Sequence, residues 1–488
     1  MYRSANDDRP SRPSFHSMSL DTRAAVRTRI APAIGLAALA VGTMWLRTSN
    51  VSQEMWLLAD QVRDWRVALL PWRELPGHGP PSIAGGYSLG PIFYWTLWTY
   101  ARVGRAFADS LPHTAVVVQA VVSGLIDLVL CAAIYRRLGR WSVALAVLLW
   151  QVSAPTDLVV SRTLWNPNQA LDFGKLAIAL VLWGPADLTT ARRMAIVGTA
   201  VLSAQAHWSG LPLAVSILGW LVARAVFAER HVDVRGLMEI VAVLVVLQLP
   251  AILDSSILSL WPTAGAGAVA SVTLGGAIQR AHDALYVMAN SIERFLVAGI
   301  GPQPFAILLA AGALASAVRL RHEWDLAAVT IAPLIVILLL VLTWPGRIED
   351  YWFRVVALSA ALLLAVGLIE MSRRIGAAPA AAGAVLLAVG VVLLPYRIRT
   401  ASQLLRLPAY GPLVRASRAL AASAGRVRDV AVPWYPGVIE GIPIGGFIPN
   451  TPNEDAGAVY EFAGGRLDPS ARQSAVLHED GTFELRND

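Results

Sequence analysis

Two carboxylates and a guanidinium lie close together in the stretch LADQVRDWRVALLPW, residues 58–72. If this stretch is helical, Asp60 and Asp64 lie four residues apart on one face, and Arg63 lies one turn from Asp60. A carboxylate within hydrogen-bond reach of a hydroxyl can accept its proton and so make the oxygen a nucleophile. The alternative is a solvated ion pair on an exposed helix face, which is a common arrangement.

A segment rich in glycine and proline follows, GHGPPSIAGGYSLGPIFYW at residues 77–95. Glycine and proline favour an irregular loop, in which the backbone can approach a ligand closely. His78, Tyr87 and Tyr94 supply polar groups in this segment. We therefore expect His78 and Tyr94 to contact a substrate beside the two carboxylates.

A second group of polar residues lies in TDLVVSRTLWNPNQALDFGKL, residues 156–176. The guanidinium of Arg162 is suited to a phosphate, because it can donate two parallel hydrogen bonds to it. Asn166 and Asn168 flank Pro167, which is expected to open the following helix. Both asparagines are candidate substrate ligands, although Asn166 could instead cap that helix.

Ionisable residues within apolar runs form a third group. Asp172 and Lys175 are three residues apart in the outer half of a predicted span, and Asp127 lies deeper in another. Ionisable groups at membrane depth are functional candidates, so Lys175 is included in the predicted substrate site. The alternative is that Asp172 and Lys175 form a mutual ion pair that offsets their burial.

Two further candidates lie near the ends of apolar runs. His207 in SAQAHWSG ends one run, where a lone histidine is either structural or part of a functional site. The segment PGRIEDYWFR, residues 345–354, places Arg347 and Arg354 in a break where the positive-inside bias does not favour arginine. His207 and Arg354 are therefore included among the predicted substrate-binding residues.

The elements that position these residues are predicted to be membrane helices. Of the 488 residues, 56% are hydrophobic and 15% are charged, whereas a soluble domain carries roughly 25% charged residues. Long apolar runs recur, which indicates an all-α polytopic membrane protein. The net charge of +7 fits positively charged loops on one side of a membrane, not nucleic-acid binding. The single cysteine, Cys131, excludes a disulfide within the chain.

About eleven apolar segments are predicted to span the membrane, since a span needs roughly 20 apolar residues. They lie near residues 30–47, 114–135, 141–156, 168–184, 194–210, 211–228, 237–253, 304–319, 326–344, 352–371 and 378–396. Arg-rich breaks, such as YRRLGR at 135–140 and SRRIG at 372–376, fall at every second connection. This alternation predicts an inside N-terminus, an outside C-terminus and long outer segments at 48–113 and 254–303.

The chain is therefore expected to have three regions. Residues 1–29 form a cytoplasmic tail before an uncleaved first span, because no small-residue cleavage site follows that span. Residues 30–396 form the transmembrane domain, whose outer loop 48–113 is expected to hold helices along the interface, anchored by tryptophans. Residues 397–488 form a small mixed α/β extracytoplasmic module, in which VLHEDGTFEL predicts a hairpin with an Asp-Gly turn.

Four motifs occur in order on the predicted outer face. They are DQVRD (60–64), GPPS (79–82), GPIFY (90–94) and SRTLWNPN (161–168). In this order they resemble motifs of the GT-C superfamily of integral-membrane glycosyltransferases, which includes protein O-mannosyltransferases and the aminoarabinose transferases of lipid A. The resemblance covers roughly residues 30–395. In one departure, this chain has Asp60-Gln61 where the better-known members carry Asp-Glu.

The resemblance implies transfer of a sugar from a polyprenyl-phosphate carrier to an acceptor hydroxyl outside the cytoplasmic membrane. It implies that Asp60 is the base, that Asp64 assists it, and that Arg63, Arg162 or Arg354 holds the carrier phosphate. No nucleotide-binding loop, metal or cofactor is expected. The expected partners are the lipid-linked donor, membrane lipid and an acceptor glycan, lipid or protein, and nucleic acid is not among them.

Three alternatives remain open at this point. A lipid-linked sugar flippase or other transporter would use the same intramembrane charges, although the long outer loops favour an enzyme. A polymerase of the O-antigen type would be an enzyme with a different site. A non-catalytic homologue that binds lipid or a partner is compatible with the absence of the second acid beside Asp60.

Overall fold

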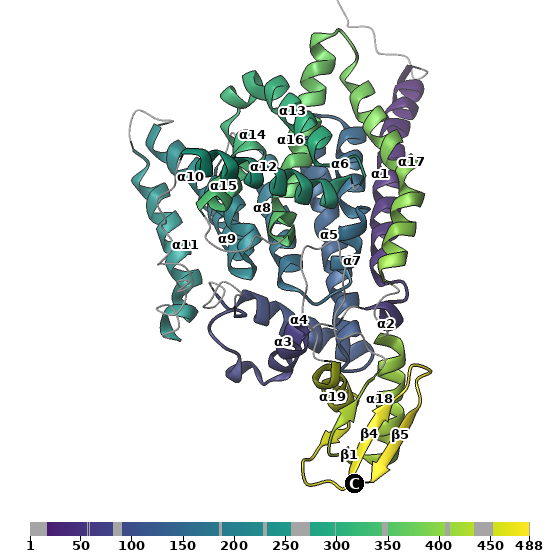
Figure 1. Cartoon of the computed structure of the whole chain (residues 1–488). Coiled ribbons are helices and arrows are strands. Elements are labelled where there is room, and N and C mark those ends of the chain that lie inside the picture. The colour runs from purple at the N-terminus through teal and green to yellow at the C-terminus, as the bar shows by residue number, and fades with distance from the viewer. Residues whose placement is uncertain are drawn as a thin grey trace, which may run out of the picture.

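The computed structural model describes residues 17–55, 57, 59–81, 90–184, 188–227, 232–254, 274–297, 299–343, 350–405, 410–433 and 452–487. Tyr87, Arg347 and part of the GPPS motif lie outside the described residues. The described chain is a bundle of helices with a small α/β module at one end (Figure 1).

The bundle helices coincide with the apolar runs of the sequence. They are α1 (Ser17–Thr48), α5 (Pro112–Leu138), α6 (Trp141–Val152), α7 (Pro155–Ser161), α8 (Asn166–Leu182), α9 (Thr190–Ala206), α10 (Leu211–Phe227), α11 (Val234–Leu253), α13 (Pro302–His322), α14 (Trp324–Val329), α15 (Ile331–Thr343), α16 (Arg354–Arg374) and α17 (Pro379–Leu405). Each segment predicted to span the membrane lies on one of these helices or on a broken pair.

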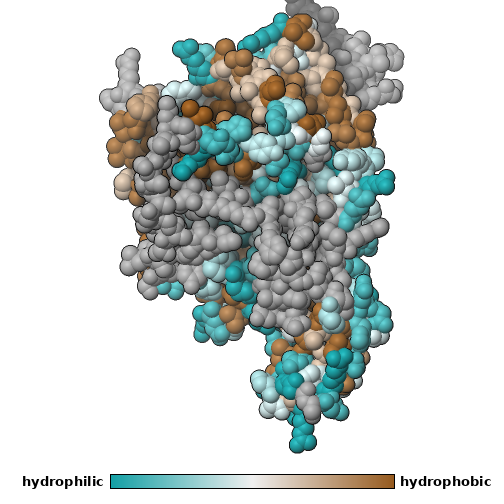
Figure 2. Space-filling model, viewed as in Figure 1, coloured by the Kyte–Doolittle hydropathy of each residue, from teal (hydrophilic) through white to brown (hydrophobic). Residues whose placement is uncertain are grey.

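The all-α polytopic class is confirmed. Within the described residues, six helices are long and apolar enough to cross a membrane, and a seventh crossing results if the bent pair α6 and α7 is one span. Brown, hydrophobic side chains gather over the upper bundle helices in Figure 2, and teal ones cover much of the C-terminal module. The total of about eleven spans stays a prediction, because several bundle helices, such as α8 and α9, have only 17 residues each.

Proline sets the breaks that matter for the polar residues. Pro155 forces Ala154 into an extended conformation, with a ψ of 130°, and α6 therefore ends before α7 begins at an angle of 67°. Pro167 stands in the first turn of α8, where its missing N–H costs nothing. Trp165 is the N-cap residue of α8, so the predicted capping by Asn166 does not occur.

The first outer loop folds into short helices, as predicted. These are α2 (Val51–Glu54), α3 (Ala59–Leu69), the 3₁₀ turn η1 (Trp72–Glu74) and α4 (Ile92–Phe107). α3 packs against α4, and the Trp98 indole donates a hydrogen bond to the Leu70 carbonyl at the end of α3, at 3.1 Å.

One tryptophan of this loop has a different role from the predicted one. Trp65 is fully buried, so it is part of the protein core and does not anchor α3 in the bilayer surface. The reason is that Val62, Trp65 and Ala68 form the apolar face of α3, and this face packs inward. Trp72 remains 48% exposed, with its ring 5.4 Å from that of Trp95, so it is still available to an interface.

The second outer segment also contains a helix. α12 (Leu274–Leu296) is amphipathic and packs against α13 and α16 through buried residues such as Ile292 and Phe295. It also supports η4 (Asp350–Phe353), because Ser291 and Arg294 donate hydrogen bonds to the Asp350 carboxylate at 2.6 and 2.7 Å. The predicted long segment at 254–303 is thus partly a packed helix.

The C-terminal module is mixed α/β, as predicted. Its elements are α18 (Tyr410–Ala424), β1 (Arg426–Val427), β2 (Val430–Ala431), α19 (Pro452–Phe462), β3 (Arg466–Leu467), β4 (Gln473–Leu477) and β5 (Phe483–Asn487). The strands form a parallel pair β1-β3 and a sheet of order β2-β4-β5. β4 and β5 are the predicted hairpin, and Gly481 adopts a φ of 88° in its turn, which favours glycine.

The last bundle helix continues past residue 397. α17 continues to Leu405 because the charge of Arg397 is satisfied inside the bundle, where the guanidinium donates hydrogen bonds to the Trp150 carbonyl and the Ser153 hydroxyl. The helix can therefore extend past the end of its apolar run, and α18 begins at Tyr410.

The module docks onto the first outer loop. Arg66 of α3 pairs with Glu461 of α19 at 3.1 Å, and Arg415 of α18 donates to Gln53 of α2 at 2.7 Å. Buried apolar residues of both parts form one continuous cluster, which includes Trp65, Tyr410 and Leu477. The acidic stretch and the module therefore form one body on the same end of the bundle (Figure 1).

This arrangement gives a prediction for the membrane sides. Cys131 is buried, so a new surface cysteine is the site that a membrane-impermeant maleimide can reach. Glu479→Cys, at the exposed hairpin turn, is expected to label in intact cells, whereas Ala378→Cys, between α16 and α17, is expected to label only after lysis. Labelling of Ala378→Cys in intact cells would reverse the assigned orientation.

Candidate functional site

Asp60 lies in the first turn of α3 and is half-buried. Its Oδ1 accepts a hydrogen bond from the backbone N–H of Gln61 at 2.9 Å, and the carboxylate also accepts one from the Trp165 indole. The positive end of the helix backbone faces a carboxylate at this position, which favours the charged form. Asp60 is thus held in place and is still partly exposed.

Asp64 is held more tightly, one turn further along α3. It is 2% exposed, and its Oδ1 accepts hydrogen bonds from Arg63 Nε at 2.8 Å and from the Tyr94 hydroxyl at 3.0 Å. Tyr94 is the last residue of the GPIFY motif, lies in the first turn of α4, and is also buried. The structure therefore brings together Asp60, Arg63, Asp64 and Tyr94, which we call the acid cluster.

Burial dominates the electrostatics of the acid cluster. Burial raises the pKa of Asp64 to about 7, and the nearby charge of Asp60 adds to this rise while Arg63 opposes it. Burial also raises the pKa of Asp60, again against the effect of Arg63. A carboxyl group that exchanges a proton near neutral pH, as Asp64 does, is suited to general acid–base chemistry.

Aromatic rings connect the acid cluster to the ends of three bundle elements. The Trp165 ring lies 4.5 Å from that of Tyr351 in η4, and the Tyr351 ring lies 5.4 Å from that of His207. His207 precedes the 3₁₀ turn η2 (Trp208–Gly210), and its Nδ1 accepts the Ser209 N–H at 3.0 Å. His207 is therefore a neighbour of the site through these rings, and its Nδ1 already serves as a helix cap.

A chain of buried charges lies behind these rings in the bundle. Arg354 donates to the Asp157 carboxylate at 2.8 Å, Arg47 lies 3.7 Å from Asp157 and 3.1 Å from Asp127, and Lys175 donates to Asp127 at 2.7 Å. We call these five residues the intramembrane network. Each of its cations is at least 97% buried and contacts a carboxylate, so their charges are compensated within the bundle.

The alternative considered for Asp172 and Lys175, a mutual ion pair, is not the pairing observed. Lys175 pairs with Asp127 of α5, whereas Asp172 accepts a hydrogen bond from Ser123 at 2.6 Å. The reason is that α8 and α5 pack side by side, so that Lys175 meets a carboxylate across the helix interface. Lys175 is fully buried in this contact.

Asn168 belongs with Arg354. Its Oδ1 accepts a hydrogen bond from Arg354, and its Nδ2 donates to the carbonyls of Val160 and Thr163 at 2.9 and 2.7 Å. These contacts fix the connection between α7 and α8, which carries Trp165. Asn168 and Arg354 therefore position the neighbour of Asp60 from inside the bundle.

Arg162 contacts the end of α1 and the helix that follows it. It donates to the Leu46 carbonyl and to Ser49 Oγ at 3.0 Å, and it pairs with Glu54 of α2 at 3.0 Å. Its guanidinium joins the end of α1 to the first outer loop. The guanidinium N–H groups that were predicted to bind a phosphate thus donate hydrogen bonds to acceptors within the protein.

Arg162→Ala is expected to lower the free energy of unfolding by about 1.5–3 kcal/mol, the cost of losing hydrogen bonds to a charged group. Arg162→Lys should lie between this variant and wild type, because it keeps the charge opposite Glu54 but loses the fork. Thermal denaturation in detergent measures both effects. The affinity for polyprenyl phosphate is measured at a temperature where all three proteins are folded. Equal affinity in wild type and both variants would show that Arg162 is not part of the substrate site.

The remaining predicted residues lie at the edges. His78 lies 3.8 Å from the Asp254 carboxylate at the end of α11, and its Nδ1 lies 2.8 Å from the Gly79 carbonyl. Asn166 is half-buried at the start of α8. Among the described residues, no three His, Cys, Asp or Glu side chains lie close enough together to hold a metal ion.

Sequence reasoning missed three residues of this region. Arg47 and Asp157 complete the intramembrane network, and an ionisable residue at the end of an apolar run was the available signal for both. Tyr351 was not singled out because nothing in its local sequence distinguishes it from an ordinary interfacial aromatic residue. Its position between Trp165 and His207 arises only from the packing of distant segments.

Comparison with known proteins gives a likeness in structure alone. No family model matches the sequence, and no curated protein matches it. The crystal structure of ArnT from Cupriavidus metallidurans bound to undecaprenyl phosphate is 13% identical over 89% of this chain and 85% of its own, with a TM-score of 0.50. The apo ArnT structure is 13% identical over 91% and 92% of the two chains, also with a TM-score of 0.50.

An oligosaccharyltransferase from Archaeoglobus fulgidus, in complex with Zn and sulfate, is 14% identical over 91% of this chain and 67% of its own, with a TM-score of 0.49. The likeness to ArnT extends over nearly the whole of both chains, which establishes a shared fold. The all-α membrane fold that the resemblance implies is thereby confirmed.

Proposed function

We propose that this chain is a membrane glycosyltransferase, which transfers a sugar from a polyprenyl-phosphate donor to an acceptor hydroxyl. The observation that carries the proposal is the acid cluster, which combines a half-exposed carboxylate, Asp60, with a buried and oriented one, Asp64. This cluster lies in a fold shared with a protein that has been crystallised with undecaprenyl phosphate. We place the protein in the cytoplasmic membrane with the acid cluster on the extracytoplasmic side.

Asp60 is the general base of the proposed reaction. As the acceptor oxygen bonds to the anomeric carbon, its proton passes to the Asp60 carboxylate, and the bond from that carbon to the phosphate oxygen breaks with its electron pair on the phosphate. The products are the glycosylated acceptor and the free polyprenyl phosphate. Partial exposure supports Asp60 over Asp64, because the base must reach a substrate.

Arg63 is the proposed partner of the leaving phosphate. Its side chain is 41% exposed, whereas Arg162 and Arg354 are 6% and 3% exposed and are bonded to protein acceptors. A guanidinium beside the phosphate stabilises the charge that develops as the bond breaks. Asp64 orients Arg63 through the 2.8 Å hydrogen bond, and Tyr94 in turn orients Asp64.

A transfer assay with labelled polyprenyl-phosphate sugars and purified protein tests the proposal. Appearance of the label on a water-soluble or lipid acceptor, with release of polyprenyl phosphate, supports it. Movement of the intact donor across liposomes without transfer would instead indicate a flippase. Binding of the donor without either process would indicate a non-catalytic homologue.

The pH dependence gives a separate prediction. Asp64 must be ionised to hold Arg63, and burial raises its pKa to about 7. The value of kcat/KM should therefore rise with pH through about 7. Below this pH, Asp64 is protonated and its ion pair with Arg63 is lost. In Asp64→Asn the rising limb near pH 7 should disappear or move. A limb that is unchanged in this variant would assign the ionisation to another group.

A further inference from the structure

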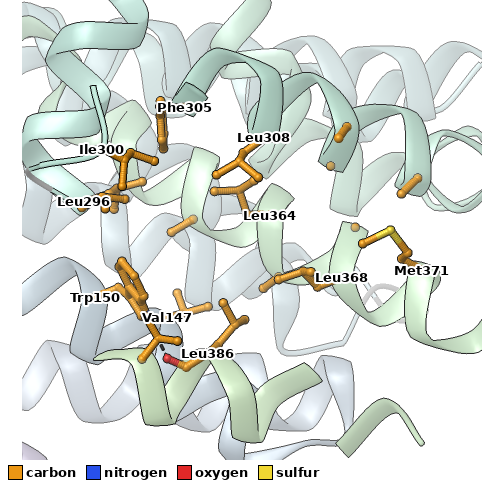
Figure 3. Close-up of a pocket in the computed structure, with 18 of the residues that line it drawn as sticks. Val147, Trp150, Leu296, Ile300, Phe305, Leu308, Leu364, Leu368, Met371 and Leu386 are labelled. Carbon is orange, nitrogen blue, oxygen red and sulfur yellow. Dashed lines mark hydrogen bonds between the residues drawn. The ribbon is translucent and has the colours of Figure 1, made fainter. Parts of the chain in front are cut away.

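A groove of about 380 Å³ lies on the bundle, away from the acid cluster. It is formed by α6, the end of α12, α13, α16 and α17, and its lining consists of hydrophobic residues and glycines. Figure 3 shows Phe305, Leu308 and Leu364 on one side of this space and Trp150 and Leu386 on the other. The volume falls within the roughly 300–1,000 Å³ typical of ligand sites.

The groove opens toward the hydrocarbon of the membrane. Leu308, Met371 and Val389 at its edge are 51%, 48% and 41% exposed, and large apolar side chains with this exposure face lipid in a membrane bundle. The groove is deep at the crossing of α13 and α16, because the two helices touch there through their backbones. A Cβ added at Gly367 would lie 2.6 Å from the Gly312 Cα, so α16 cannot carry a side chain at this crossing.

One end of the groove continues into a charged cleft. Ala315 lines both the groove and the cleft, which also contains Arg319, Arg373 and Arg374. Its acidic residues are Glu323 and Glu370, so three arginines face two glutamates and one positive charge is in excess. This end lies on the side of the Arg-rich breaks, opposite the acid cluster.

Two of these arginines are placed to bind a phosphate. Arg373 is 53% exposed at its side chain and contacts Glu370 at 2.7 Å, while the exposed Arg374 donates to the Ala315 carbonyl at 3.1 Å, directly at the junction. Exposed guanidinium groups at the height of lipid headgroups attract anionic lipid. Arg319, by contrast, is bonded to both glutamates and is more buried.

The other end of the groove has a different character. Arg397 lies beyond Trp150 there, but it is fully buried, stacks 4.5 Å from the Trp150 ring and donates to protein carbonyls. It therefore offers no exposed charge to a headgroup. A lipid in this groove has its headgroup at the Arg-rich end.

We propose that the groove and the cleft together bind one anionic glycerophospholipid from the leaflet on the Arg-rich side. An acyl chain lies in the groove along Leu364 and Leu368, and the phosphate contacts Arg373 and Arg374. This site is distinct from that of the proposed donor, because the donor phosphate belongs at the acid cluster on the opposite face. It does not depend on the proposed transfer reaction.

Native mass spectrometry of delipidated protein tests the proposal, with phosphatidylglycerol as the probe and phosphatidylcholine as the neutral lipid. Ala315→Phe fills the junction and should weaken the binding of one phosphatidylglycerol, while Leu314→Phe, on the 76% exposed neighbour, is the matched control. Equal binding in the two variants, or equal binding of the two lipids to wild type, would overturn the proposal.

A second pair of variants keeps the test independent of packing. Arg373→Gln combined with Arg374→Gln should weaken phosphatidylglycerol binding about tenfold, and Arg321→Gln, at the same membrane height but outside the cleft, should leave it unchanged. Undecaprenyl phosphate added at equal concentration should not displace the bound phosphatidylglycerol. Displacement would assign the groove to the carrier and refute the proposal.

Discussion

Asp60→Asn is expected to lower the rate of sugar transfer by roughly 10²–10⁴-fold, the range typical of losing a general base. Asparagine has nearly the same shape and can still accept hydrogen bonds from the Gln61 N–H and the Trp165 indole, so the local fold should persist. It cannot take the acceptor proton at neutral pH. The measurement is the initial transfer rate at saturating donor, with equal amounts of folded protein.

Asp64→Asn is the companion variant and should have a smaller effect. Its amide oxygen can still accept the Tyr94 hydroxyl, but it no longer attracts Arg63 as an anion does. Glu74→Gln, which removes an exposed carboxylate of the same loop, should have no effect. An inactive Asp64→Asn beside a nearly normal Asp60→Asn would exchange the two roles, and activity in both would contradict the transferase proposal.

Arg354→Met is expected to destabilise the bundle by about 3–5 kcal/mol, because removing one partner leaves a buried charge uncompensated. Among the described residues, Asp157 would keep Arg47, at 3.7 Å, as its ion-pair partner, and the Asn168 Oδ1 would lose the guanidinium that donates to it. Methionine fills a similar volume, so the loss comes from charge and hydrogen bonds. The unfolding temperature in detergent measures the change.

Two controls distinguish the loss of the intramembrane network from the general effect of removing an arginine. Arg399→Ala removes an exposed arginine of α17 and should leave the unfolding temperature nearly unchanged. Arg354→Met combined with Asp157→Asn removes one charge of each sign, and it should recover part of the lost stability. If Arg354→Met alone is as stable as wild type, Arg354 is not needed to compensate the charge of Asp157.

The sequence allowed the helices and the acid cluster to be predicted, because both depend on local order. Apolar runs of the right length identify spans, and the four-residue spacing of Asp60 and Asp64 identifies one helix face. Tyr94, which donates a hydrogen bond to Asp64, could also be identified as a site residue because it ends a recognisable motif. The Asp-Gly turn identified the final hairpin for the same local reason.

Partners across helix interfaces could not be predicted in this way. Lys175 has an acid three residues away on its own helix, yet it pairs with Asp127 of α5 because that carboxylate lies directly opposite. The sequence places Arg162 in an outer loop, but in the fold its guanidinium donates a hydrogen bond to the Leu46 carbonyl near the end of α1. Which helix lies beside which is decided by packing over the whole chain, and single-sequence patterns carry little of that information.

The shared core of the first outer loop and the C-terminal module has a consequence for biosynthesis. Trp65 and the apolar face of α4 are among the first parts of the chain to leave the ribosome, but Tyr410, Ala475 and Leu477, which complete their cluster, are among the last. The loop with Asp60 must therefore wait, incompletely packed, while every intervening helix is inserted. Chaperones and proteases on that side of the membrane would meet this exposed surface first, and a premature stop codon after α17 would leave it exposed permanently.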